Sequence, residues 1–245
     1  MNTSALTIAL IHGYGFDQRI WSPVELAFDG FHVIHLSLPG FGNTQLIGTY
    51  TIEALAAHFW ADLDARGESN VHLVGHSMGG YVCMEMLAQQ SSRVESLCLV
   101  HSHVFADPDE KKKTRTVVLD EIKASGREGF ARRMIGSLVF DAKAHDILVQ
   151  QLITRGLEYD DDAWYYGTQA IRDRNDHAET LRSFNRPCLM LMGDADPVVP
   201  LPFVYQQAAL ASVLQLKVYQ NVGHLGMYEN TLTMIEDLIS FYRSK

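Results

Sequence analysis

The chain has little cysteine, no long apolar run and no excess of basic charge. Its three cysteines, Cys83, Cys98 and Cys188, lack the spacing of a zinc site or a disulfide framework, so we expect reduced, buried thiols in a cytoplasmic protein. No run approaches the roughly 18 apolar residues of a membrane span, and no basic-then-apolar leader is present. We therefore expect neither a membrane partner nor a secretory signal. The net charge of −9 does not suggest a nucleic-acid partner.

Short apolar runs alternate with stretches of helical spacing over much of the chain. Runs of this kind, without internal alternation, are typical of parallel strands covered by helices on both faces. The runs expected to be strands are 6–11, 31–36, 71–74, 96–100, 188–192 and 214–218. Helices are expected over 51–66, after Ser77 and over 232–242. The pattern predicts an α/β fold.

Residues 103–182 interrupt this alternation. Four helical stretches follow one another there, at 109–124, 127–139, 143–156 and 161–174, without a comparable strand-like run. The segment holds 13 of the 20 Lys and Arg residues, but also 15 of the 29 Asp and Glu residues. The simplest organisation is a core of residues 1–102 and 183–245 with an inserted helical cap, or lid, at 103–182.

A candidate nucleophile lies directly after the apolar run at 71–74. The stretch Gly75-His76-Ser77-Met78-Gly79 reads G-x-S-x-G and leads into a helical segment. A strand, a sharp turn and a helix are the context in which this motif lifts a serine hydroxyl clear of the backbone. The motif is short enough to occur by chance, so the prediction depends on finding the partners that a serine nucleophile needs.

A serine hydroxyl needs an adjacent base and a carboxylate that orients the base. Among 11 histidines, His224 is the best base, because it follows the last strand-like run. Asp194 and Asp196 both follow the run at 188–192, and we favour Asp196, which lies further into its loop, before Pro197. The loops after parallel strands share one rim, so Ser77 and these partners should meet there.

The oxyanion of a tetrahedral intermediate needs two backbone donors. In this architecture one is the N–H after the nucleophile, here Met78, and the other comes from the loop after the first core strand. That loop reads His12-Gly13-Tyr14-Gly15, and the N–H of Tyr14 is the expected donor.

These motifs, in this order, resemble the α/β-hydrolase family. The resemblance covers residues 5–100 and 184–243 and rests on five motifs: His12-Gly13, Leu38-Pro39-Gly40-Phe41-Gly42, Gly75-His76-Ser77-Met78-Gly79-Gly80, Gly193-x-x-Asp196-x-x-Val199-Pro200 and Gly223-His224. It implies a three-layer α/β-hydrolase fold with a helical cap. Many members carry an N-terminal hairpin with an antiparallel strand, for which this chain leaves little room. We therefore expect a mostly parallel sheet of about six strands, with none antiparallel.

Other residues are candidates for the walls of a substrate pocket. They neighbour the predicted site or lie in loop and cap positions, and simple packing is an equal or better explanation for most of them. The candidates are His12, Phe41, His76, Ser102, His103 and Trp164.

The resemblance implies a cofactor-free, metal-free serine hydrolase that cleaves a small acyl ester, similar to small carboxylesterases. Esterases that act on methyl esters of acyl-carrier-protein conjugates are an alternative, although the acids of the cap offset the charge that an acidic carrier protein would need. Lactonases, C–C bond hydrolases and the lyase of menaquinone synthesis use similar triads. A non-catalytic ligand receptor is the alternative from another class.

Overall fold

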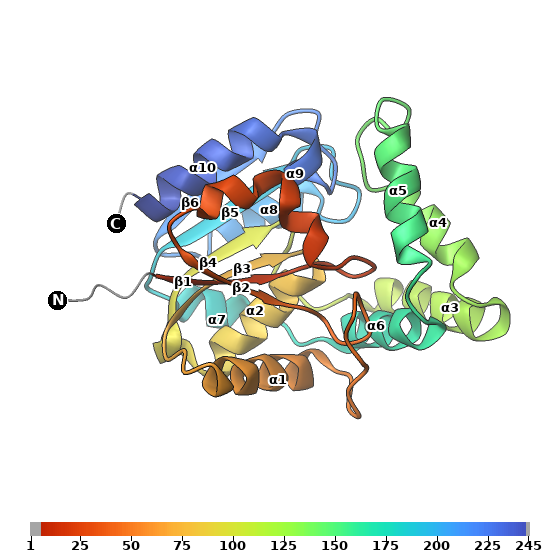
Figure 1. Ribbon diagram of the computed structural model, residues 1–245, viewed down its shortest axis with the longest axis horizontal. Helices are drawn as coiled ribbons and strands as arrows, with labels where there is room; N and C mark the ends of the chain where they lie inside the picture. Colours follow the sequence, from red (N-terminus) through yellow and green to blue (C-terminus); the bar gives the residue numbers. More distant parts are fainter. Residues whose placement is uncertain (1–5, 244–245) are drawn as a thin grey trace.

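A six-stranded sheet forms the centre of the computed structural model, which describes residues 6–243 (Figure 1). All neighbouring strands are parallel, in the order β2-β1-β3-β4-β5-β6. The strands are β1 (Thr7–Ile11), β2 (His32–Leu36), β3 (Val71–His76), β4 (Val94–Val100), β5 (Cys188–Gly193) and β6 (Leu214–Tyr219). The predicted parallel sheet of about six strands is therefore confirmed, with bounds within two residues of those expected.

The expected absence of an antiparallel strand concerned residues 1–10. Residues 7–10 belong to β1, which pairs in parallel with β2 and β3. Residues 1–5 lie outside the described part of the chain.

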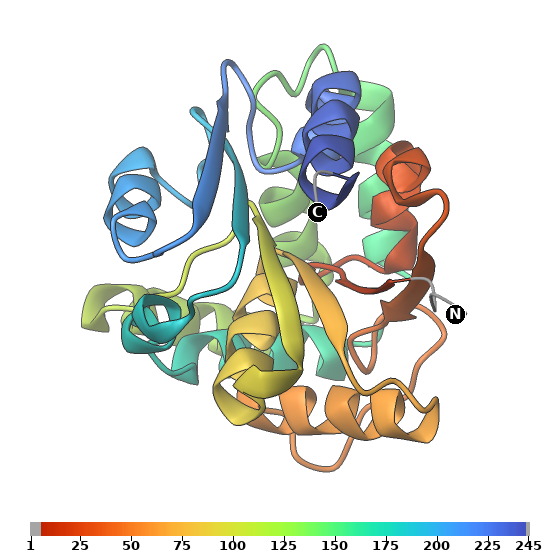
Figure 2. The ribbon, with the colours of Figure 1, turned by 90° about the vertical axis from the view of Figure 1, so that its left-hand side faces the viewer.

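Helices cover both faces of the sheet (Figure 2). On one face lie α1 (Ile52–Ala65), α2 (Met78–Gln89) and α7 (Ala178–Ser183), and on the other lie η1 (Gln18–Phe28) and α10 (Thr231–Arg243). The remaining elements around the sheet are η2 (Ser91–Arg93), α8 (Leu201–Ala208), which lies beside β6 at the sheet edge, and α9 (Gly226–Glu229). Sequence periodicity did not predict η1, α7, α8 or α9.

Four further helices lie between β4 and β5 in the chain and beside the C-terminal ends of the strands (Figure 1). They are α3 (Asp109–Ser125), α4 (Glu128–Gly136), α5 (Asp146–Gly156) and α6 (Asp161–Asp173), with α3 packed on α6 and α4 on α5. All four were expected, although the loop after α4 begins earlier than predicted. The last predicted cap residues belong to α7, which packs on the core helix α2. The boundary at 182/183 stays a prediction.

The interior is apolar and continuous. Every residue of β1 and β3 is buried, because helices cover these central strands on both sides. Cys83, Cys98 and Cys188 are buried, and within residues 6–243 they form no disulfide. In the same residues, no helix has both the length and the apolar character needed to cross a membrane.

Candidate active site

Ser77 occupies a strained turn between β3 and α2. Its backbone has φ 51° and ψ −118°, a conformation that L-residues rarely adopt and that costs roughly 1–3 kcal/mol. Neighbouring elements hold the turn. The Ser77 N–H donates to the Val100 carbonyl at 3.0 Å, while its own carbonyl accepts from Ser102 Oγ at 2.8 Å. The serine hydroxyl is thereby presented at the C-terminal end of the central strand β3.

Two glycines make this turn possible. A Cβ atom on Gly75 would lie 2.5 Å from the Gly79 carbonyl oxygen and the Gly80 nitrogen. A Cβ atom on Gly79 would overlap the backbone oxygen of Ile11 in β1. The motif needs glycine at these positions because backbone, which cannot move aside like a flexible side chain, fills the space.

Asp196 and His224 meet as predicted from their places after β5 and β6. His224 Nδ1 lies 2.8 Å from Asp196 Oδ2 and 3.0 Å from Oδ1. Asp196 Oδ1 also accepts the N–H groups of Val198 and Val199, at 2.8 and 3.0 Å. Burial alone would raise the pKa of Asp196, but the charge of His224 and the hydrogen bonds of two histidines outweigh it and lower that pKa.

The alternative carboxylate, Asp194, faces elsewhere. Its Oδ1 accepts the N–H of Asn221 at 2.7 Å, so it stabilises the turn after β6. The geometry therefore favours Asp196 as the partner of His224.

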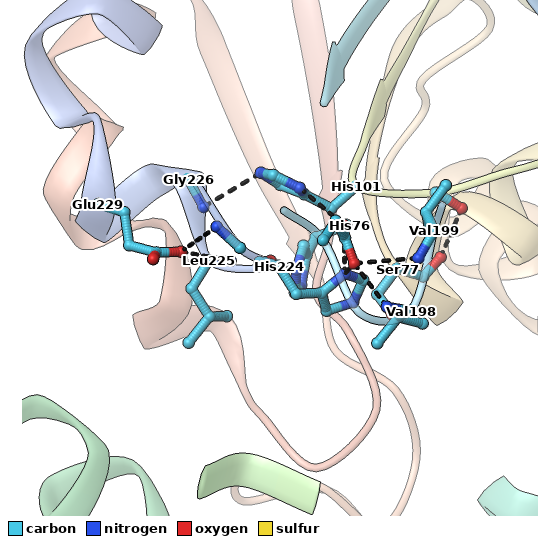
Figure 3. Close-up of polar contacts among 12 residues, drawn as sticks. His76, Ser77, His101, Val198, Val199, His224, Leu225, Gly226 and Glu229 are labelled. Atoms are coloured by element: carbon cyan, nitrogen blue, oxygen red, sulfur yellow. Dashed lines mark hydrogen bonds and ion pairs between the residues drawn. The ribbon is translucent and has the colours of Figure 1, made fainter. Parts of the chain in front are cut away.

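A second histidine contacts the same carboxylate. His101 follows β4 directly, is fully buried, and places Nδ1 at 3.0 Å from Asp196 Oδ2 (Figure 3). Its Nε2 accepts the N–H of Gly226 at 3.1 Å, which makes Nδ1 the protonated nitrogen and the donor to Asp196. Burial is the main cause that lowers the pKa of His101. The ring is neutral because its Nε2 accepts a hydrogen bond. His101 thus links the loops after β4, β5 and β6.

The loop that carries His224 is held on several sides. Glu229 Oε2 accepts the N–H groups of Gly223 and Leu225, at 3.0 and 3.3 Å (Figure 3). His76 Nε2 donates to the His224 carbonyl at 3.1 Å, and burial holds the pKa of His76 well below its usual value. The N–H of His224 donates to the Leu138 carbonyl, just after α4, at 2.6 Å. These contacts fix the backbone of the predicted base, while Asp196 holds its ring.

Ser77 and His224 border one cavity of about 210 Å³. Its walls come from the loop after β1 (Tyr14, Phe16), from α2 (Tyr81), from cap helices α3, α4 and α6, and from Pro197 and Val198. Within residues 6–243, Ser77 Oγ makes no hydrogen bond to the His224 ring. The distance between a nucleophile and its base is often long without substrate and shortens when substrate binds.

Residues 8–235 match the model of the alpha/beta hydrolase family. The chain belongs to the alpha/beta hydrolase family. Its sequence is 23% identical to Lipase 3 of Moraxella sp. over 98% of this chain and 78% of the relative. It is 25% identical to the pimeloyl-[acyl-carrier protein] methyl ester esterase of Citrobacter koseri, over 89% of this chain and 86% of the relative.

Solved structures agree in fold. A thermophilic esterase from Thermogutta terrifontis superposes with a TM-score of 0.90 at 25% identity, covering 98% of this chain and 90% of the other. The enol-lactonase of Burkholderia xenovorans LB400 gives a TM-score of 0.89 at 18% identity, over 98% and 92% of the two chains. The second likeness is evidence for the fold alone.

In this alpha/beta hydrolase, the residues expected to supply the oxyanion donors adjoin Ser77 in the chain or line its cavity. Met78 is the first residue of α2, where helix N–H groups lack intrahelical acceptors and the dipole favours negative charge. Tyr14 lies in the loop after β1, and its side chain lines the cavity. The Tyr14 hydroxyl donates to the Trp164 carbonyl at 2.6 Å and lies 2.7 Å from Thr168 Oγ1, which ties this loop to α6.

The prediction of six residues as pocket walls needs correction, because none of the six lines the cavity. All are buried behind it, where their polar atoms or rings have other partners. His12 accepts the Leu38 N–H, and Trp164 donates to the Gly156 carbonyl. His76 and Ser102 form hydrogen bonds to the backbone carbonyls of His224 and Ser77, respectively. The Phe41 ring packs edge-on against Tyr14, and the His103 ring stacks on Phe203. The true walls are mainly cap side chains.

One group of residues has the spacing of metal ligands. Ligand atoms of His101, Asp196 and His224 lie within 4.8 Å of one another. Hydrogen bonds account for this cluster, since both Nδ1 atoms face Asp196 and His101 Nε2 accepts the Gly226 N–H. The donor set therefore fits a triad with a second histidine better than a metal site.

Sequence reasoning missed two residues of the site. These residues are His101 and Glu229. The position of His101 directly after a strand was an available signal, because the predicted triad residues also follow strands. Nothing in the sequence around Glu229 indicates that its carboxylate turns back to the loop before α9.

Proposed function

We propose that this alpha/beta hydrolase is a cofactor-free serine esterase that cleaves a small acyl ester through an acyl-enzyme. The observation that carries the proposal is the shared cavity, bordered by Ser77 at its strained turn and by His224, whose ring is hydrogen-bonded to buried Asp196. Relatives named as lipases and esterases support the reaction class.

In the proposed reaction, Ser77 Oγ attacks the ester carbonyl carbon while its proton passes to His224 Nε2. Asp196 orients the imidazole and stabilises its charged form. The N–H groups of Tyr14 and Met78 hold the oxyanion. Collapse of the tetrahedral intermediate breaks the C–O bond, and the leaving alcohol takes the proton from His224. Water, activated by the same ring, then releases the acid and restores Ser77.

The alternatives use the same residues. A methyl ester on an acyl-carrier-protein conjugate is a second candidate, which the Citrobacter koseri relative favours by name. Lactone or C–C bond hydrolysis and lyase chemistry remain alternatives at the level of the fold. A non-catalytic receptor would need neither a strained serine nor a histidine–carboxylate pair.

The test is Ser77→Ala with a p-nitrophenyl ester of a short acyl chain. We expect turnover to fall by about three orders of magnitude or more, with folding unchanged, because the nucleophile is lost. The wild-type protein should also be labelled at Ser77 by a fluorophosphonate. Retained activity in the variant would refute the mechanism, and a folded wild-type protein without labelling or turnover would favour a receptor.

A further inference from the structure

The cavity beside Ser77 carries positive charge that the proposed chemistry does not use. Lys111 and Arg115 of α3 line it, together with Thr114 and Val118. These four residues are spaced i, i+3, i+4 and i+7, so they form one face of the helix, turned to the cavity. The orientation of α3 therefore turns both cations toward the cavity together.

Negative charge is scarce in the same walls. Among the described residues that line the cavity, none is an aspartate or a glutamate. Outside the lining, the Asp107 carboxylate offsets part of the positive charge, because it pairs with Arg115 and, at 2.8 Å, with Arg174. One carboxylate between two guanidinium groups leaves an excess positive charge, in a chain whose net charge is −9.

Lys111 adds to this excess. No ion pair of Lys111 is recorded within residues 6–243, whereas Lys113, two residues on, pairs with Glu110 at 3.0 Å. Lys111 also lies in the first turn of α3, where the helix dipole disfavours a positive side chain. Helix stability therefore does not account for a lysine at this position.

We propose that the substrate is an anionic ester, with a carboxylate that Lys111 and Arg115 bind while Ser77 attacks the ester carbonyl. This inference rests on the proposed function. The apolar cavity walls, which include Val118 and Phe130, would hold the carbon chain between the two groups. Lys111 is exposed, whereas only 20% of the Arg115 side chain is exposed. A carboxylate beside a cation that is largely shielded from water gains more than one in bulk water.

The experiment compares ester pairs that differ only in charge. Monomethyl glutarate and methyl 5-oxohexanoate have the same chain, with a carboxylate oxygen replaced by methyl, and test an anion on the acyl side. Acetoxyacetate and acetoxyacetone test it on the alcohol side. Acid release at constant pH gives kcat/KM for each. We expect at least one pair to favour its anion about tenfold, as for a hydrogen bond between charged groups.

Lys111→Gln should remove most of that preference, because it should lower kcat/KM for the anionic ester far more than for its neutral counterpart. Lys113→Gln is the matched control, because it removes the same charge from the same helix outside the cavity lining, and it should keep the preference. The preference of the wild type should also shrink between low and high salt.

Two results would overturn the inference. One is a wild type that favours neither anion over its ketone, and the other is a preference that Lys111→Gln leaves unchanged. Either result, with Ser77→Ala inactive on the neutral esters, would leave the esterase proposal standing. Activity retained in Ser77→Ala would instead refute the esterase mechanism itself.

Discussion

His101 Nδ1 lies 3.0 Å from Asp196 Oδ2, the same oxygen that lies 2.8 Å from His224 Nδ1. One carboxylate oxygen thus accepts from two imidazoles, one of which has its other nitrogen bound to the Gly226 N–H. His101 therefore acts on His224, the proposed base, in two ways. It shares the negative charge of Asp196, and it holds the backbone two residues beyond His224.

Replacing His101 should impair catalysis more than binding. We expect His101→Ala to lower kcat about tenfold with a smaller change in KM, because supporting partners of an orienting carboxylate typically matter to this extent. The acidic limb of the pH–rate profile should move to higher pH. An Asp196 carboxylate that no longer accepts a hydrogen bond from His101 stabilises the charged ring of His224 more strongly. Steady-state kinetics from pH 5 to 9 measure both effects.

His101→Gln, which keeps a donor and an acceptor, should recover part of the loss. His58→Ala, at an exposed histidine on α1, should leave the profile unchanged. A profile that does not move in His101→Ala, although stability falls, would mean that His101 supports only the fold.

Glu229 is the second positioning residue that we expect to matter. Its carboxylate accepts three backbone N–H groups, from Gly223, Leu225 and Phe140. In Glu229→Gln, the side-chain NH₂ group would face at least one of these N–H groups, and two donors cannot form a hydrogen bond with each other. We therefore expect the His224 loop to shift and kcat to fall about tenfold. The exposed residue Glu236 on α10 gives the control Glu236→Gln, and equal activity of the two variants would contradict the role.

Asp17 should make stability depend on pH. Burial acts to raise its pKa, but hydrogen bonds from Arg19 and Tyr159 outweigh it and lower that pKa to about 2. A depressed carboxyl pKa contributes stability above the unfolded value, near 3.9, and loses it as the pH falls through the folded value.

We expect Asp17→Asn to lower the free energy of unfolding by about 1–2 kcal/mol at pH 7, with a difference that narrows as the pH falls from about 4 towards 2. Urea unfolding at pH 7, 5 and 3 measures this trend. Asp120→Asn, at an exposed position in the middle of α3, is the matched control and should change the free energy of unfolding by less than about 0.5 kcal/mol at each pH. A difference that stays constant with pH would rule out the ionised carboxylate as its source.

The glycine at position 79 should tolerate no side chain. A Cβ atom on residue 79 would overlap the Ile11 backbone, so Gly79→Ala must push α2 away from β1. We expect this displacement to lower the free energy of unfolding by about 2 kcal/mol. We expect a lower Tm and, because Ser77 moves with the turn, a loss of activity in the protein that still folds. Gly48→Ala has no atom within 4 Å of its added Cβ and should be neutral in both measurements.

The sheet was predictable because its strands are short buried runs that end at loops with glycine or proline. Likewise, the places of Ser77, Asp196 and His224 after three strands followed from the common rim of a parallel sheet. The 3₁₀ helix η1 was not predicted. Its buried residues Ile20, Trp21, Val24, Ala27 and Phe28 follow a helical spacing, but Pro23 lies among them, and a proline inside such a pattern normally indicates that a helix ends. Its start at Asp17, whose side chain accepts the Arg19 N–H, is visible only in three dimensions.

The cavity could not be predicted in the same way. The periodicity of α3 identifies its faces, but the face with Lys111 and Arg115 meets the cavity only because α3 packs on α6. Five of the six wall candidates lie in or beside the loops after strands and Trp164 lies in the cap, yet all six are buried and none lines the cavity. Contacts between distant segments, such as Glu229 with Phe140, carry no local signal.

The segment after α4 couples the cap to the proposed base. The Leu138 carbonyl accepts the His224 N–H, and the Phe140 N–H donates to Glu229. Lifting this segment would break both bonds and release the backbone that carries His224, so an opening of the cap at this point would interrupt catalysis. An opening along α3 would break neither bond and would leave His224 in place beside the cavity.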